Sequence, residues 1–127
     1  MRKQIAMVVA LVVMLVPLVA AAAFAADQII QCRSTPCYGS SNSDLVYERV
    51  GNRKNDRIIL KGGNDRVQAN AYNRDIDVVR GGTGFDKIDV EDNDRRDTAG
   101  GGDGGRDWCI VDSRSEAGRG CERVSVQ

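Results

Sequence analysis

Aspartate recurs along this chain at a fixed interval. Four aspartates are each 21 residues apart: Asp44, Asp65, Asp86 and Asp107. An apolar residue or cysteine stands two positions after each of them and keeps the same interval: Val46, Val67, Ile88 and Cys109. Two columns that stay in register over four units predict a solenoid, in which each unit forms one coil and stacks on the next.

A second group of positions repeats between these aspartates. The 21-residue interval is kept by two further columns: Asn52, Asn73 and Asp94, and Arg53, Arg74 and Arg95. Asp56 and Asp77 keep the interval as well, whereas Asp97 arrives one residue early. Each unit therefore holds two turns and two short strands, which is one complete coil.

The pattern of apolar residues predicts which side of each strand faces inward. After each aspartate of the first column, apolar residues alternate, as expected for a strand with one buried face. The predicted interior residues of these strands are Val46, Val50, Val67, Ala69, Ala71, Ile88, Val90, Cys109 and Val111. Those of the second strands are Ile58, Leu60, Val79 and Ala99. A flexible glycine-rich linker, the alternative, would not keep these residues in register.

Glycines cluster just before the first-column aspartates. Gly81 to Asp89 matches every defined position of the nonapeptide G-G-x-G-x-D-x-U-x, where U is a large apolar residue. The stretches beginning at Gly62, Gly102 and Gly39 match it in part. The chain thus resembles the RTX, or haemolysin-type, calcium-binding repeat family, and is similar to short exported actinobacterial proteins with cysteine-flanked repeats. The resemblance implies an all-β fold, a parallel β-roll or β-solenoid.

The same resemblance implies calcium ions between adjacent turns on one edge. It places them between Asp44 and Asp65, Asp65 and Asp86, and Asp86 and Asp107, beside Gly63, Gly82, Gly84 and Gly105. Calcium requires six to eight oxygen ligands, and glycine lets the backbone turn successive carbonyls toward one point. A metal-free solenoid, in which each aspartate only caps its turn, remains the alternative.

The other edge departs from the family's pattern. Its turns have lost nearly all glycines and carry the Arg53, Arg74 and Arg95 column, and a coil is longer than two nonapeptides. We therefore expect Arg–Asp pairs and an asparagine ladder there, with calcium on the first edge only. Glu91 to Asp103 does not form an EF-hand, because Asp97 stands where that loop requires glycine and Asp103 replaces the closing glutamate.

The first residues have the pattern of an export signal. Arg2 and Lys3 precede an apolar run from Ile5 to Leu18, and Ala23-Phe24-Ala25 offers a cleavage site. We interpret residues 1–25 as a secretory signal peptide; an uncleaved anchor is the alternative. The exported part then divides into an N-terminal cysteine-containing cap (26–38), the repeat solenoid (39–112) and a C-terminal cap (113–127), with no membrane span.

Four cysteines in an exported chain of this size predict disulfide bonds. Three pairings are possible, and we favour Cys32 with Cys37 and Cys109 with Cys121, because each would hold one end of the domain. Free or metal-bound thiols are the alternative. No C-x-x-C spacing, which is typical of zinc sites, is present.

Composition excludes several functions. The sequence contains no histidine, which rules out Ser-His-Asp catalysis and most zinc sites. The numbers of basic and acidic residues are equal, so the net charge gives no electrostatic argument for binding nucleic acid. We expect a secreted, non-enzymatic calcium-binding protein that folds on binding calcium and has a structural or surface role. The alternative is a metal-independent solenoid that binds carbohydrate or a cell-surface polymer, although its aromatic residues form no column.

Overall fold

The computed structural model describes residues 28–49, 51 and 54–127, so the predicted signal peptide lies outside the described residues. The described chain contains β-strands and one short 3-10 helix, η1 (Arg114–Glu116). The strands are β1 (Gln28–Gln31), β2 (Cys37–Tyr38), β3 (Asp44–Tyr47), β4 (Arg57–Ile59), β5 (Arg66–Gln68), β6 (Val78–Thr83), β7 (Lys87–Asp89), β8 (Thr98–Asp103), β9 (Trp108–Val111) and β10 (Arg123–Val126). Within this part of the chain, no helix is long and apolar enough to cross a membrane.

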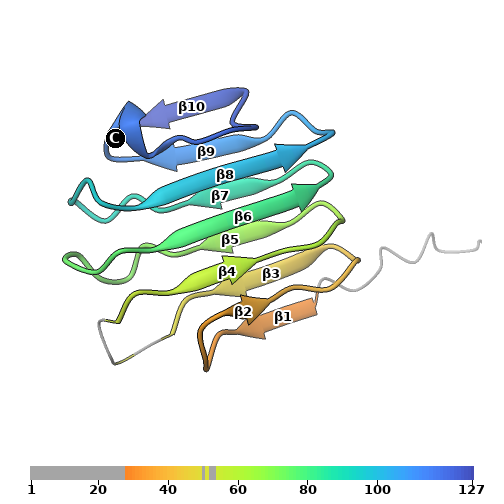
Figure 1. The fold of residues 1–127 in the computed structure, drawn as a ribbon, viewed down its shortest axis with the longest axis horizontal. Coiled ribbons are helices and arrows are strands. Elements are labelled where there is room, and N and C mark those ends of the chain that lie inside the picture. The colour runs from red at the N-terminus through yellow and green to blue at the C-terminus, as the bar shows by residue number, and fades with distance from the viewer. Residues whose placement is uncertain (1–27, 50, 52–53) are drawn as a thin grey trace, which may run out of the picture.

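The strands form two parallel sheets that face each other (Figure 1). The larger sheet has the order β1-β3-β5-β7-β9-β10, and the smaller has the order β2-β4-β6-β8. Each coil contributes one strand to each sheet, and Val46 pairs with Val67, which pairs with Ile88. The expected all-β solenoid with coils of about 21 residues is therefore confirmed.

The core lies between the two sheets and consists of the predicted columns. In the larger sheet it contains Val46, Val67, Ile88 and Cys109, and in the smaller sheet Cys37, Ile58, Val79 and Ala99. Burying a valine or isoleucine side chain stabilises a fold by about 2 kcal/mol. Each coil buries only a few such side chains, so its stability depends on its neighbours above and below.

One interior prediction is wrong. Ala71 is exposed, because β5 ends at Gln68 and the chain leaves the sheet before reaching it. Val50 lies outside the described residues. The buried position two residues after Val46 is instead Glu48, which is 2% exposed and stands in register with Ala69. The repeat thus places a carboxylate in a column that is otherwise apolar.

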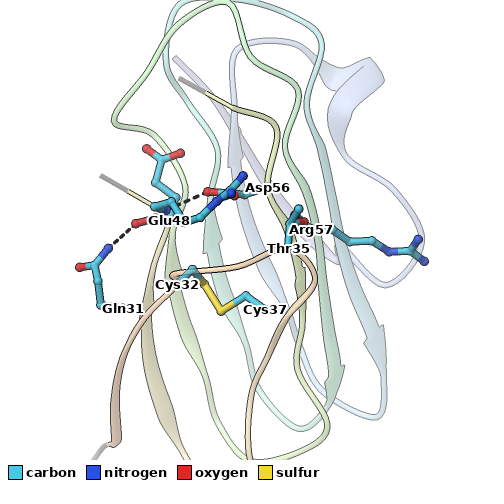
Figure 2. The surroundings of a disulfide bond; sticks show 8 residues. Gln31, Cys32, Thr35, Cys37, Glu48, Asp56 and Arg57 are labelled. Atoms are coloured by element: carbon cyan, nitrogen blue, oxygen red, sulfur yellow. Dashed lines mark hydrogen bonds and ion pairs between the residues drawn. A yellow bond between two sulfur atoms is a disulfide. The ribbon is translucent and has the colours of Figure 1, made fainter. Parts of the chain in front are cut away.

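Both predicted disulfides are present, one at each end of the stack. Cys32 follows β1 of the larger sheet and is bonded to Cys37 in β2 of the smaller sheet (Figure 2). Cys109 in β9 is bonded to Cys121, whose sulfur lies 3.1 Å from the carbonyl oxygen of Ala99 in the smaller sheet. The first bond therefore ties the two sheets together at the N-terminal end of the stack, and the second holds the segment before β10 against β9 at the C-terminal end.

The stack extends into both predicted cap segments. β1 pairs with β3 at the N-terminal end, and β10 pairs with β9 at the C-terminal end, in the same parallel register as the central coils. Between β9 and β10, Ser113 and Glu116 form a capping box around η1. The larger sheet therefore gains a strand at each end.

The early arrival of Asp97 is absorbed within one coil. Val78 pairs with Thr98, and the turn before it contains Asn93 with a φ of 75°. The segment from Asp97 to Asp107 is one residue longer than the equivalent segment from Asp77 to Asp86, and its loop contains Gly104 with a φ of 97°. The two adjustments cancel, so the first aspartate column keeps its register throughout.

Candidate functional site

The four aspartates of the first column form a ladder along one edge. The backbone N–H of each of the first three donates to Oδ1 of the aspartate one coil further on. The N···O distances are 2.8 Å from Asp44 to Asp65, 2.9 Å from Asp65 to Asp86 and 2.8 Å from Asp86 to Asp107. The expected stacking of equivalent acidic turns is thus present.

The aspartates of the second column form a matching ladder on the other edge. The N–H of Asp56 donates to Oδ1 of Asp77, and that of Asp77 donates to Oδ1 of Asp97, both at 2.7 Å. These N–H groups lie just before the strands, and the carboxylates satisfy donors that would otherwise be buried without a partner. The metal-free capping role considered from the sequence therefore exists on both edges.

Both ladders end on a glutamate of the C-terminal segment. The N–H of Asp107 donates to Oε2 of Glu122 at 2.8 Å, and that of Asp97 donates to Oε1 of Glu116 at 3.2 Å. Neither glutamate was predicted as a site residue from the sequence, because neither keeps the repeat interval. The longer glutamate side chain lets a chain that has left the repeat supply the last acceptor.

The ladder uses only one oxygen of the Asp65, Asp86 and Asp107 carboxylates, whereas both oxygens of Asp44, the first in the row, accept hydrogen bonds from Ser40. Oδ2 of Asp65, Asp86 and Asp107 is buried and has no hydrogen-bond partner. Burial raises the pKa of Asp65 to about 6 and that of Asp86 to about 7. A buried carboxylate oxygen without a partner is costly unless it gains a proton or a cation. These three atoms are therefore available as metal ligands.

The glycines predicted around this edge allow the close stacking of its turns. Gly63, Gly82 and Gly84 have φ angles of 109°, 97° and 125°. A Cβ on Gly105 would lie 1.6 Å from the carbonyl oxygen of Gly84 in the preceding coil. A Cβ on Gly81 would lie 2.3 Å from Oδ2 of Asp86. The glycines thus make room for neighbouring backbone and for the unpartnered carboxylate oxygen.

Two groups of acids converge on the second edge, where no ion was expected from the sequence. Within each group the carboxylate oxygens lie within 4.8 Å of one another. The groups are Glu48, Asp56 and Asp77, and Asp92, Asp94 and Asp97. In the described part of the chain, these are the sets of three acids that can meet at one ion. The second set follows β7 and precedes β8, so strands flank it and it is not an EF-hand.

The interactions expected on this edge are made by other residues than those predicted. Among the described residues, the Asp56 side chain pairs with that of Arg49, and the Asp94 side chain pairs with that of Arg96 at 3.4 Å. Arg74 of the predicted column contacts Asp94 through its backbone N–H, at 2.7 Å. An asparagine does connect coils, but it is Asn55, whose Oδ1 accepts a 2.8 Å bond from the N–H of Ile76. Arg53 and Asn52 lie outside the described residues.

Proton affinity is also high on the second edge. Burial, and after it the neighbouring Glu48 carboxylate, raise the pKa of Asp77 to about 8. Burial likewise raises the pKa of Asp97 to about 8 and that of Asp92 to about 6. Both edges therefore hold carboxylates whose charged form is disfavoured near neutral pH without a compensating cation.

The site is thus a double stack of buried acids built on a repeating backbone. All the buried polar and charged residues of the described chain are acids, and Asp75 is among those whose carboxylate oxygens have no hydrogen-bond partner. No protein-family model, curated protein or solved structure matches this chain.

Proposed function

We propose that this chain is an exported calcium-binding repeat protein whose solenoid is stabilised by ions along its first aspartate edge. The observation that carries the proposal is the row of buried, unpartnered Oδ2 atoms of Asp65, Asp86 and Asp107. These atoms belong to adjacent coils and repeat with the turns. A row of equivalent, uncompensated oxygens fits a row of equivalent cations.

The donor set favours a hard cation. The chain has no histidine, and all four cysteines are in disulfide bonds, so carboxylate and backbone carbonyl oxygens are the ligands it offers. Oxygen-only coordination with several carboxylates suits calcium, whereas magnesium keeps more water and fewer protein ligands. The glycine turns supply carbonyls close to the aspartates. The residues that would hold the ions are the aspartates and glycines named from the sequence: Asp44, Asp65, Asp86 and Asp107, with Gly63, Gly82, Gly84 and Gly105.

The proposed mechanism couples folding to ion binding. Folding stacks carboxylates of like charge beside one another and removes them from water, which opposes coil formation at neutral pH. Calcium, when bound, would supply the compensating positive charge, so its binding free energy would add to the free energy of folding. Asp65, Asp86 and Asp107 would keep their ladder bonds through Oδ1, and their Oδ2 atoms would be ligands for the ions.

A titration of the purified exported protein tests this proposal. Calcium added to chelator-treated protein is expected to release or absorb heat, to increase the strand signal in circular dichroism and to raise the melting temperature. Excess chelator should reverse all three changes. Absence of binding heat, together with an unchanged melting temperature at millimolar calcium, would rule the function out.

One observation favours a second candidate function, binding of an anionic polymer. On the larger sheet, the Trp108 ring is flanked by Lys87 Nζ at 4.3 Å and by the Arg123 guanidinium at 4.2 Å. Arg66 stands in the same row, beside Lys87. Pull-down with sulfated and with neutral polysaccharide, each with and without chelator, separates the two functions. Retention on the sulfated polymer that is insensitive to chelator supports the second.

A further inference from the structure

Glu48 occupies an unusual place in the repeat. Its column continues through Ala69, Val90 and Val111, which are all fully buried. The backbone places these residues equivalently: the N–H of Glu48 donates to the carbonyl of Gln68, and that of Ala69 donates to the carbonyl of Asp89, one coil on in each case. A glutamate in an apolar column costs stability unless its carboxylate has a specific partner.

The Glu48 carboxylate is only partly satisfied by the protein. Oε1 accepts a hydrogen bond from the N–H of Ala71, whereas Oε2 is buried and has no hydrogen-bond partner. The Glu48 side chain and Asp56 lie near the N-terminal end of the stack, beside the Cys32–Cys37 disulfide (Figure 2). Glu48 is therefore held in place through one oxygen while the other remains available.

Other carboxylates lie close to that of Glu48. Carboxylate oxygens of Glu48, Asp56 and Asp77 lie within 4.8 Å of one another. Asp75 is 2% exposed, and neither of its carboxylate oxygens has a hydrogen-bond partner. Its charge acts on Glu48 and on Asp77, so it belongs to the same local group. Arg49 contacts Asp56 and compensates part of this negative charge.

We propose that Glu48, Asp56 and Asp77, with Asp75 beside them, form a divalent-cation site on the second edge that is separate from the repeat sites of the first edge. The spacing fits one ion, because two ligands on opposite sides of calcium are separated by about 5 Å. Several carboxylates and no nitrogen or sulfur donor select calcium over zinc or copper. Among the coils that the structure describes, only this one carries a glutamate at the interior position, so the site occurs once among them.

Isothermal calorimetry with calcium on wild-type protein and two matched variants, all purified as exported, tests the site. Glu48→Gln keeps the shape of the side chain and an oxygen that accepts from the N–H of Ala71, but it removes the negative charge. Asp86→Asn is the matched change on the first edge, where it keeps an oxygen that accepts from the N–H of Asp65. Glu48→Gln is expected to bind one calcium fewer than wild type, or to bind one calcium about tenfold more weakly or worse. Asp86→Asn should keep that calcium and lose binding elsewhere.

A second variant keeps the test decisive if Glu48→Gln folds poorly. Glu48→Val introduces the residue that Val90 and Val111 provide in the same column, so the fold should tolerate it. In chelator it should melt at a higher temperature than wild type, and calcium should raise that temperature by less. If either folded variant binds calcium with wild-type stoichiometry and affinity, the site does not exist and Glu48 only shares a proton with Asp77. The first-edge sites are judged separately by Asp86→Asn.

Discussion

The N–H of Asp65 donates a 2.9 Å hydrogen bond to Oδ1 of Asp86, the aspartate one coil further along the chain. This bond fixes the position of one carboxylate oxygen and leaves the other, Oδ2, buried without a partner. The same residue thus serves the fold through one oxygen and offers the second to a cation. Substitutions at Asp86 can separate these two roles.

Replacing Asp86 by alanine should destabilise the protein even without calcium. The N–H of Asp65 would lose its acceptor while remaining buried, which costs about 1–3 kcal/mol. Asp86→Asn keeps an oxygen acceptor and is expected to lose much less stability in chelator while losing calcium affinity. Urea denaturation of both variants in chelator measures the difference. Equal stability of the two variants would mean that the ladder bond contributes little.

Without calcium, the protein should become less stable as pH rises from about 4 to 8. Burial raises the pKa of Asp86 to about 7 and that of Asp77 to about 8, whereas an unfolded aspartate titrates near about 4. The folded state therefore binds more protons across this range, and the free energy of unfolding falls with increasing pH. Melting temperatures in chelator at pH 5 and pH 8 test this. A higher value at pH 8 would contradict the burial of uncompensated acids.

Calcium should reverse this pH dependence. Calcium competes with protons for the same carboxylates, so its stabilising effect should be largest near pH 8 and smallest near pH 5. The measurement is the increase in melting temperature on adding calcium at each pH. Magnesium at equal concentration serves as the control and should produce a smaller increase. An increase that does not vary with pH would indicate ligands other than these acids.

The glutamate that ends the first ladder should matter mainly for the last coil. Glu122→Ala removes the acceptor for the N–H of Asp107, so that amide should exchange with solvent faster, while the amide of Asp65 should change little. Glu122→Gln keeps an acceptor and is the matched control. Hydrogen exchange followed by mass spectrometry measures both amides. Uniform acceleration over the whole chain would show that the coils do not open separately.

Two neighbouring glycines distinguish crowding from backbone strain. A Cβ on Gly105 would lie 1.6 Å from the carbonyl oxygen of Gly84, whereas a Cβ on Gly104, at a φ of 97°, would meet nothing within 4 Å. Gly104→Ala should therefore cost about 1 kcal/mol from the left-handed backbone alone. Gly105→Ala should cost clearly more, because adjacent turns must separate. Thermal denaturation of both variants gives the comparison, and a smaller loss for Gly105→Ala would contradict the close stacking.

The repeat interval made much of the fold predictable. Because coils stack in register, equal spacing in sequence becomes alignment in space, and Val46, Val67 and Ile88 therefore meet in one core column. The disulfide pairs were predictable for a related reason, since cysteines close in sequence lie at the same end of a solenoid. Ala71 was misplaced because alternation alone does not show where a strand ends.

The acid cluster of the second edge was harder to predict. Glu48 is in register with Ala69, and the interval alone could have revealed it, but its charge argued against an interior position. The pairing of Arg49 with Asp56 depends on how a long side chain folds back over its own turn, which spacing does not encode. The glutamates that end the ladders lie outside the repeat, so no periodic signal marks them.

The ladders also have a consequence for how such a chain can change its length. Coils in the middle of the stack receive and supply the same kind of ladder bond, so deleting or duplicating one whole coil between Asp65 and Asp86 would keep the same kind of junction. A change of length that is not compensated within its own coil, as the early Asp97 is, would move an amide out of register with its acceptor. Growth and shrinkage by complete coils, with Glu116 and Glu122 retained as a fixed terminus, is therefore the inexpensive route for variation in this architecture.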